Sequence, residues 1–198
     1  MKRLHREDIY GWSVFDERLD IDFHSVLWVH PAGNVVIDPL PLSDHDLTHL
    51  EQLGSVDTIV ITNSDHIRTS KELAKATGAR ILGPVAERVL LECDAWLDDG
   101  DEVVPGLRVM TLHGSKTPGE LALLLDETTL ITGDLIRAHE AGSLALLPEA
   151  KLSDKAKAIA SLRRLCDLPR VETVLPGDGW PVFRDGARAL ADLAAKFA

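Results

Sequence analysis

The chain has 198 residues and a formal net charge of −11, with 21 Lys and Arg against 32 Asp and Glu. The acidic balance is spread along the sequence, which argues against nucleic acid or an anionic membrane as partner and favours a small-molecule ligand. No apolar run approaches the roughly 18 residues of a membrane helix, and the N-terminus lacks the apolar segment of a secretion signal, so we expect a cytoplasmic protein.

A single domain over residues 1–198 is expected. The length suits one hydrophobic core, and no linker rich in Pro, Gly or Ser and no charge block divides the chain. The sequence leaves the oligomeric state open. An unsatisfied apolar patch on the surface would favour a homodimer.

Short apolar runs bounded by Gly, Pro, Asp or Asn predict strands. In chain order they are "VLWV", "NVVI", "VDTIVIT", "LRVMTL", "LALLL", "TTLIT" and "VETVL". Caps and apolar spacing predict helices over residues 43–53, 66–77, 84–91, 153–166 and 185–197. Because several strands follow one another between residues 107 and 131, the pattern indicates sheets covered by helices on the outside.

Polar clusters follow four of these strands. They are "NSDH" at residues 63–66, "HGSK" at 113–116, "GD" at 133–134 and "GDG" at 177–179. Ligands of α/β proteins bind at the carboxyl ends of strands, so the four clusters could converge on one site. The alternative is that Gly and Asp only make turns after strands.

Five motifs in this order resemble the metallo-β-lactamase fold superfamily. They are "VVIDPL" with Asp38, "ITNSDH", "HGSKTPGE", "LITGDL" and "LPGDGW", and they span most of the chain, roughly residues 28–183. The resemblance implies an α+β fold, a four-layer αββα sandwich of two mixed β-sheets flanked by helices. It also implies a metal-binding cleft at the strand ends, used mostly for hydrolysis.

The departures from the family pattern change the expected metal site. Asn63 or Ser64 stands where the family keeps its early histidine pair, Lys116 replaces the histidine after the Pro-Gly pattern, and Asp178 replaces the last histidine. Carried over residue by residue, one metal position has lost all its imidazoles. The other keeps Asp65, His66 and Asp134, with Asp178 as a fourth ligand.

These four residues, taken with Lys116, sum to about two negative charges, which matches one divalent ion. Oxygen ligands with a single nitrogen suit Mn, Fe or Mg at least as well as Zn. One metal can lower the pKa of a bound water and polarise a carbonyl or phosphoryl oxygen. We therefore expect at most one divalent metal (Zn, Mn or Fe), or none.

Two functions follow from this site. The first is a metal-dependent hydrolase of a small ester, thioester, lactone or phosphoester, with Asp65 and Lys116 as catalytic residues and the metal on Asp65, His66, Asp134 and Asp178. The second is a non-catalytic binding or regulatory domain, in which Lys116 and the carboxylates close an ion-pair network without metal. Four further residues are expected to line the cleft: Asn63, Ser64, His113 and Trp180.

Overall fold

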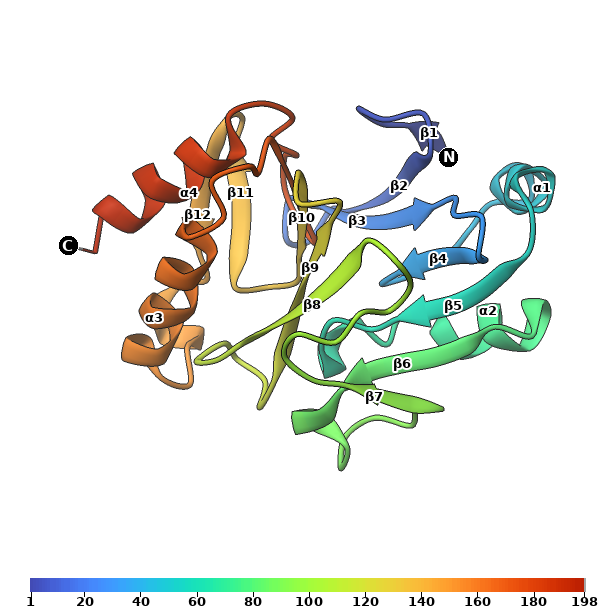
Figure 1. Cartoon of the computed structure of the whole chain (residues 1–198), viewed down its shortest axis with the longest axis horizontal. Helices are drawn as coiled ribbons and strands as arrows, with labels where there is room; N and C mark the ends of the chain where they lie inside the picture. Colours follow the sequence, from blue (N-terminus) through green and yellow to red (C-terminus); the bar gives the residue numbers. More distant parts are fainter. Residues whose placement is uncertain (198) are drawn as a thin grey trace.

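Two mixed β-sheets lie face to face at the centre of the molecule, and helices cover both outer sides (Figure 1). The computed structural model describes residues 1–197. The expected αββα sandwich of the α+β class is confirmed. None of the helices described in this range is long and apolar enough to cross a membrane.

The larger sheet has its seven strands in chain order, antiparallel from β1 to β4 and parallel from β4 to β7. These strands are β1 (Lys2–Arg3), β2 (Ile9–Asp16), β3 (Ile21–Trp28), β4 (Asn34–Ile37), β5 (Val56–Val60), β6 (Arg80–Pro84) and β7 (Ala95–Leu97). Helices α1 (Asp44–Leu53) and α2 (Ser70–Thr77) cover its outer face (Figure 1).

The smaller sheet has the order β13-β10-β9-β8, with β13 parallel to β10 and the other pairs antiparallel. Its strands are β8 (Leu107–Leu112), β9 (Glu120–Leu125), β10 (Thr129–Thr132) and β13 (Thr173–Pro176). A two-stranded ribbon of β11 (Ile136–Glu140) and β12 (Ser143–Leu146) lies beside α3 (Lys155–Cys166) and α4 (Gly186–Ala195) on the outer side (Figure 1).

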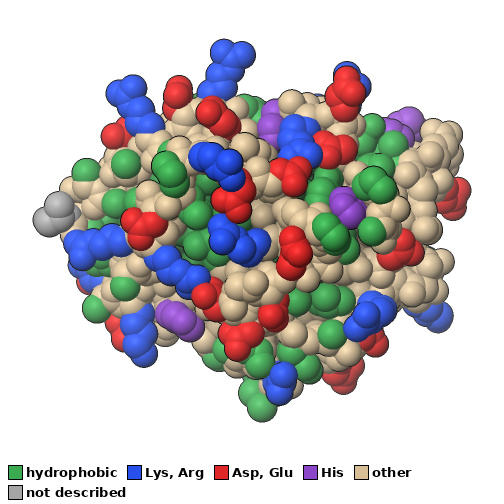
Figure 2. Space-filling view, in the orientation of Figure 1, with side chains coloured by type: hydrophobic (Ala, Val, Ile, Leu, Met, Phe, Trp, Pro, Cys, Tyr) green, Lys and Arg blue, Asp and Glu red, His purple; other side chains and the backbone are tan. Residues whose placement is uncertain are grey.

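Strand β9 shows why the chain forms layers. Leu121, Leu123 and Leu125 face the larger sheet, whereas Ala122 and Leu124 face α3 and α4. Alternate side chains of a strand point to opposite faces, so a strand between two layers is apolar on both. The surface, in contrast, has acidic and basic side chains interspersed over the face in Figure 2.

Two predicted helices differ from the structure. The helix expected over residues 66–77 begins only at Ser70, because a 3₁₀ turn ends at His66 and Arg68 then takes the left-handed φ of +44°, which an α-helix cannot continue. The helix expected over 84–91 is only a 3₁₀ turn over Val85–Glu87, and Pro84 ends β6 instead of opening a helix.

The other three predicted helices are found, with shifts of one or two residues at their ends. Ser43 caps α1 by accepting a hydrogen bond from the backbone N–H of Asp46. Asp154 caps α3 in the same way through the N–H of Lys157. These side-chain acceptors satisfy N–H groups that have no partner within the helix.

Candidate functional site

The polar clusters after β5, β10 and β13 meet at one place. Strands β10 and β13 run in parallel with Thr132 opposite Pro176, so the chain leaves both strands side by side. A Cβ added to Gly133 would lie 2.9 Å from Thr62 Oγ1, and one added to Gly177 would lie 2.9 Å from His66 Cε1. The expected convergence of these strand ends is therefore present, and glycine is what permits the close approach.

Asp38 directly follows β4, and its carboxylate accepts hydrogen bonds from the turn after β5. Its Oδ1 accepts the backbone N–H of Thr62 at 2.8 Å, and its Oδ2 accepts the Thr62 hydroxyl at 2.6 Å. The same Oδ2 lies 2.8 Å from His66 Nδ1. All three side chains are buried, so Asp38 fixes the orientation of the imidazole ring.

Asp134 lies on the other side of His66. Its Oδ2 accepts a hydrogen bond from Asn63 Nδ2 at 2.9 Å, and it is 3.2 Å from Lys116 Nζ and 3.5 Å from His66 Nε2. The Asp134 side chain is only 6% exposed. One buried carboxylate oxygen thus faces three nitrogen atoms, which offsets the cost of burying its charge.

Lys116 links the buried carboxylate to a more exposed one. Its Nζ is 2.7 Å from Asp65 Oδ2, and the Asp65 side chain is 52% exposed. Asn63 positions Asp65 from the other direction, because Asn63 Oδ1 accepts the Asp65 N–H at 2.9 Å. Asp65 and Lys116 therefore form the accessible edge of the site, while Asp134 lies beneath them.

Asp178 is held by Arg137, a residue that belongs to none of the five sequence motifs. Arg137, on β11, donates from Nε to Asp178 Oδ1 at 2.9 Å and from Nη2 to Asp178 Oδ2. Both side chains are buried. Arginine stays charged at every physiological pH and its planar fork matches a carboxylate, so both oxygens of Asp178 are occupied.

Two buried glutamates and Arg68 hold the loops of the site. Glu87 accepts the N–H of Ser64 at 2.6 Å and that of Gly119 at 3.0 Å, which joins the turn carrying Asp65 to the loop carrying Lys116. Glu120 accepts from Ser115 Oγ and from the N–H of Leu135.

Arg68 donates only to backbone carbonyls, those of His24, Asp38 and Gly177. No motif signalled these roles, because all but one of these contacts join residues far apart in sequence or use the backbone; the exception joins the Ser115 and Glu120 side chains.

The charges of the site shift several pKa values. Burial lowers the pKa of His66, but the Asp38 charge and the hydrogen bonds to Asp134 and Asp38 outweigh it and raise that pKa to about 9. Burial raises the pKa of Asp134, yet contacts with His66 and Lys116 bring it well below the usual range. Burial and the neighbouring Asp134 raise the pKa of Glu120 to about 7.

The expected metal ligands are not arranged to hold an ion. Asp178 faces Arg137, and the space between Asp65 and Asp134 contains the Lys116 ammonium. Within residues 1–197, no three His, Cys, Asp or Glu side chains are placed to share one metal. The residues as arranged therefore do not fit a resident metal, and the ligand roles expected for these side chains stay predictions.

The four residues expected to line the cleft differ in position. Asn63 contacts Asp134, and Ser64 contributes its backbone N–H to Glu87. His113 is exposed, and its backbone N–H and C=O pair with Ser161 of α3. Trp180 is 58% exposed, and its backbone N–H bonds the C=O of Ala138. Only Asn63 thus has a side-chain hydrogen bond to the expected ligand set.

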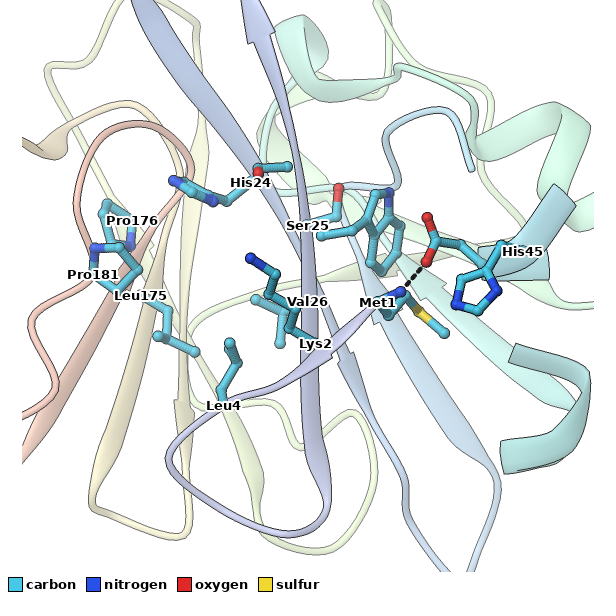
Figure 3. Close-up of a pocket in the computed structure, with 14 residues that line it drawn as sticks. Met1, Lys2, Leu4, His24, Ser25, Val26, His45, Leu175, Pro176 and Pro181 are labelled. Atoms are coloured by element: carbon cyan, nitrogen blue, oxygen red, sulfur yellow. Dashed lines mark hydrogen bonds and ion pairs between the residues drawn. The ribbon is translucent and has the colours of Figure 1, made fainter. Parts of the chain in front are cut away.

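A cavity of about 620 Å³ lies near this site without including it. Figure 3 shows His24, Pro176 and Pro181 on one side of the cavity and Ser25, Met1 and His45 on the other. Pro176 precedes the Gly177 that adjoins His66, whereas Asp65, Lys116 and Asp134 do not line the cavity. This cavity is not lined by the charged cluster of Asp65, Lys116 and Asp134. We therefore take the strand ends, and not the cavity, as the candidate functional site.

Comparisons with known proteins identify the family of this chain and agree with its fold. A family model described as the metallo-beta-lactamase superfamily matches residues 1–197. The chain is similar to hydroxyacylglutathione hydrolase of Cereibacter sphaeroides, at 34% identity over 161 residues that cover 75% of this chain and 60% of that protein. The chain therefore spans less than two thirds of that relative's length.

Solved structures show the same fold. The DIM-1 metallo-beta-lactamase has a TM-score of 0.75 at 15% identity, covering 98% of this chain and 95% of its own. A metallo-beta-lactamase from Erythrobacter litoralis has a TM-score of 0.74 at 15% identity, with coverage of 98% and 95%. At such identities the likeness concerns the fold alone.

Proposed function

This chain belongs to the metallo-β-lactamase superfamily, and we propose that it hydrolyses a small thioester or ester. The observation that carries the proposal is the partly exposed pair of Asp65 and Lys116 above the buried Asp134. The relationship to a protein named hydroxyacylglutathione hydrolase supports a thioester as the first substrate class to test.

In this proposal, side chains of the protein carry out the hydrolysis. The Lys116 ammonium would donate to the carbonyl oxygen of the substrate as negative charge develops there. Burial lowers the pKa of Lys116, but its contacts with Asp65 and Asp134 raise it overall, so the group is charged at neutral pH. Asp65 would accept a proton as the water oxygen bonds the carbonyl carbon, and would return that proton to the leaving thiol or alcohol as its bond to the same carbon breaks. Asp134 would keep Lys116 in place.

The second candidate is a non-catalytic binding or regulatory domain. One observation favours it: Asp134 and Asp178, two of the four expected ligands, already face cations of the chain and are buried. A closed ion-pair network of this kind keeps the fold without requiring a reaction.

A substrate panel separates the two candidates. Acyl-glutathione thioesters, simple thioesters, esters, lactones and phosphoesters are assayed with chelator and, separately, with Zn²⁺, Mn²⁺ or Fe²⁺. We expect thioester hydrolysis that falls at least about 100-fold in Asp65→Asn and in Lys116→Met, because each loses a group used in the transition state.

Asp192→Asn is the matched control, because Asp192 is a largely exposed aspartate of α4 outside the site. It should keep the wild-type rate. Uniform inactivity on the whole panel, or a low rate that Asp134→Asn leaves unchanged, would support the binding domain instead.

A further inference from the structure

We infer that Lys116 and Arg137 are built-in counter-cations, which take the place of metal ions in the strand-end site and exclude a divalent ion from it. The inference stands on the ion pairs of the site and does not depend on whether the chain hydrolyses a thioester. It makes the folded protein independent of metal and identifies the two side chains that keep metal out.

Lys116 occupies the space that an ion would need. Its Nζ lies 2.7 Å from Asp65 Oδ2 and 3.2 Å from Asp134 Oδ2, between the two carboxylates. A divalent ion that ligates both oxygens sits about 2.0–2.2 Å from each, so it would overlap the ammonium. Two cations at that separation repel each other strongly in a partly buried site. Metal and Lys116 are therefore alternative occupants.

Arg137 removes the fourth expected ligand. Both oxygens of Asp178 accept hydrogen bonds from its guanidinium, and the two side chains are 3% and 8% exposed. If Asp178 turned toward a metal, Arg137 would stay buried with a permanent and unpaired charge. That cost holds Asp178 in its present place.

Arg137 also alters the charge balance of the site. Counted with Lys116 but without Arg137, the carboxylates of Asp65, Asp134 and Asp178 leave about two negative charges, which one divalent ion would match. With Lys116 on two carboxylates and Arg137 on the third, two cationic side chains already face the three, in addition to the His66 ring beside Asp134. A further double positive charge would overcompensate the cluster, so electrostatics disfavours the ion even where space allows it.

Metal binding by charge-removing variants tests this inference. The variants are Lys116→Met, Arg137→Met and the double variant, all purified without chelator. Each is equilibrated with Zn²⁺ or Mn²⁺, desalted and analysed for metal content, and affinities are measured by calorimetry. Circular dichroism melts with and without EDTA show whether each variant is folded and whether metal stabilises it.

We expect the wild type to retain less than about one ion per ten chains and to melt at the same temperature with and without EDTA. Lys116→Met should retain about one ion per chain, with affinity at least about 100-fold above the wild type. The double variant should bind about ten-fold more tightly still, because Asp178 becomes available as a ligand.

Two control variants locate the bound ion and separate the role of Lys116 from the loss of any lysine. Lys155→Met removes an exposed lysine paired with Glu149 and should gain no metal. Lys116→Met combined with Asp134→Asn should lose the gain, which would locate the ion at Asp134. If Arg137→Met does not fold, Lys116→Met alone decides the outcome.

Two results would overturn the inference. One is a stoichiometric ion in the wild type whose removal by EDTA lowers the melting temperature. The other is a folded Lys116→Met variant that binds no ion even at about 1 mM metal, the weak end of specific binding.

Discussion

Arg137 holds Asp178 in a bidentate ion pair buried between β11 and the loop after β13. The two residues are 41 positions apart in sequence. Breaking a buried pair from one side is costly, because the remaining charge has neither water nor a partner. This relationship therefore makes a prediction about stability as well as about metal.

Arg137→Met should lower the free energy of unfolding by about 3–5 kcal/mol, since it leaves Asp178 charged and buried. Adding Asp178→Asn should recover about 2 kcal/mol or more of that loss, because the unpaired charge is then gone. Urea unfolding followed by circular dichroism measures both variants. A double variant as unstable as Arg137→Met alone would show that the loss comes from packing and not from charge.

The raised pKa of His66 predicts how stability depends on pH. The pKa is about 9 in the folded chain and near 6.5 when the chain is unfolded, so folding takes up a proton between these values. The contribution is fully present below pH 6.5 and is lost as pH rises through 9. Its size is on the order of 3 kcal/mol.

Urea unfolding at pH 7 and at pH 9.5 measures this effect. His66→Gln should be less stable than the wild type at pH 7 but should lose little further stability between the two pH values. His139→Gln is the matched control, because His139 lies on the exposed part of β11. It should follow the wild type. A wild type equally stable at both pH values would contradict the charged state of His66.

The architecture was predictable because several levels of the sequence agree. Apolar runs with turn residues at both ends predicted β3, β4 and β5 of the larger sheet and β8, β9, β10 and β13 of the smaller one, but not β1, β2, β6 or β7. The order of five motifs indicated the αββα sandwich. Cap residues such as Ser43 also predicted the start of a helix to within one residue. In each case a local pattern and the global fold require the same structure.

The secondary-structure predictions that were wrong have local physical causes. Arg68 adopts a left-handed φ while its side chain bonds three backbone carbonyls, so tertiary contacts override the helical pattern. Strand β2 was missed because "IYGWSVFD" mixes Gly, Ser and Asp with apolar residues, and residues 13–15 of it are exposed. Edge positions of a sheet need less burial, and their apolar pattern is weaker.

The sequence predicted that Asp65, His66 and Asp134 lie near one another, but it did not predict which charges pair. The strand-end clusters placed Asp65, His66 and Asp134 together, and these side chains do lie around Lys116 and Asn63. The sequence contains no signal that Arg137 pairs with Asp178, since such a contact depends on the three-dimensional course of β11. A single sequence therefore gives little information about which buried charges, distant in sequence, pair with each other.

Glu87 makes a prediction about the geometry of the loops. Its carboxylate is buried and accepts the N–H groups of Ser64 and Gly119. Glu87→Ala should lower the free energy of unfolding by about 2–4 kcal/mol, because two buried N–H groups lose a charged acceptor. Glu87→Gln, which keeps one acceptor oxygen, should lose less.

Urea unfolding compares these variants with Glu92→Ala. Glu92 is an exposed glutamate paired with Lys71, and its replacement should leave the midpoint near that of the wild type. Equal effects of Glu87→Ala and Glu92→Ala would rule out the loop-bridging role of Glu87.

Gly114, two residues before Lys116, allows a test of how that loop packs on α3. Its φ is +86°, and an added Cβ would lie 2.2 Å from Asp154 O and 2.4 Å from the backbone nitrogen of Ala158. Gly142 has a similar φ of +79°, but nothing lies within 4 Å of its Cβ position. The two glycines thus separate backbone strain from steric overlap.

Gly142→Ala should lower the free energy of unfolding by about 1 kcal/mol, the strain of a left-handed alanine. Gly114→Ala carries the same strain, and its Cβ would in addition meet backbone atoms at the start of α3, which cannot move aside without shifting the helix. It should therefore lose about 3 kcal/mol or more in urea unfolding. Equal losses in the two variants would mean that the loop carrying Lys116 does not pack against α3 as closely as the contacts of Gly114 require.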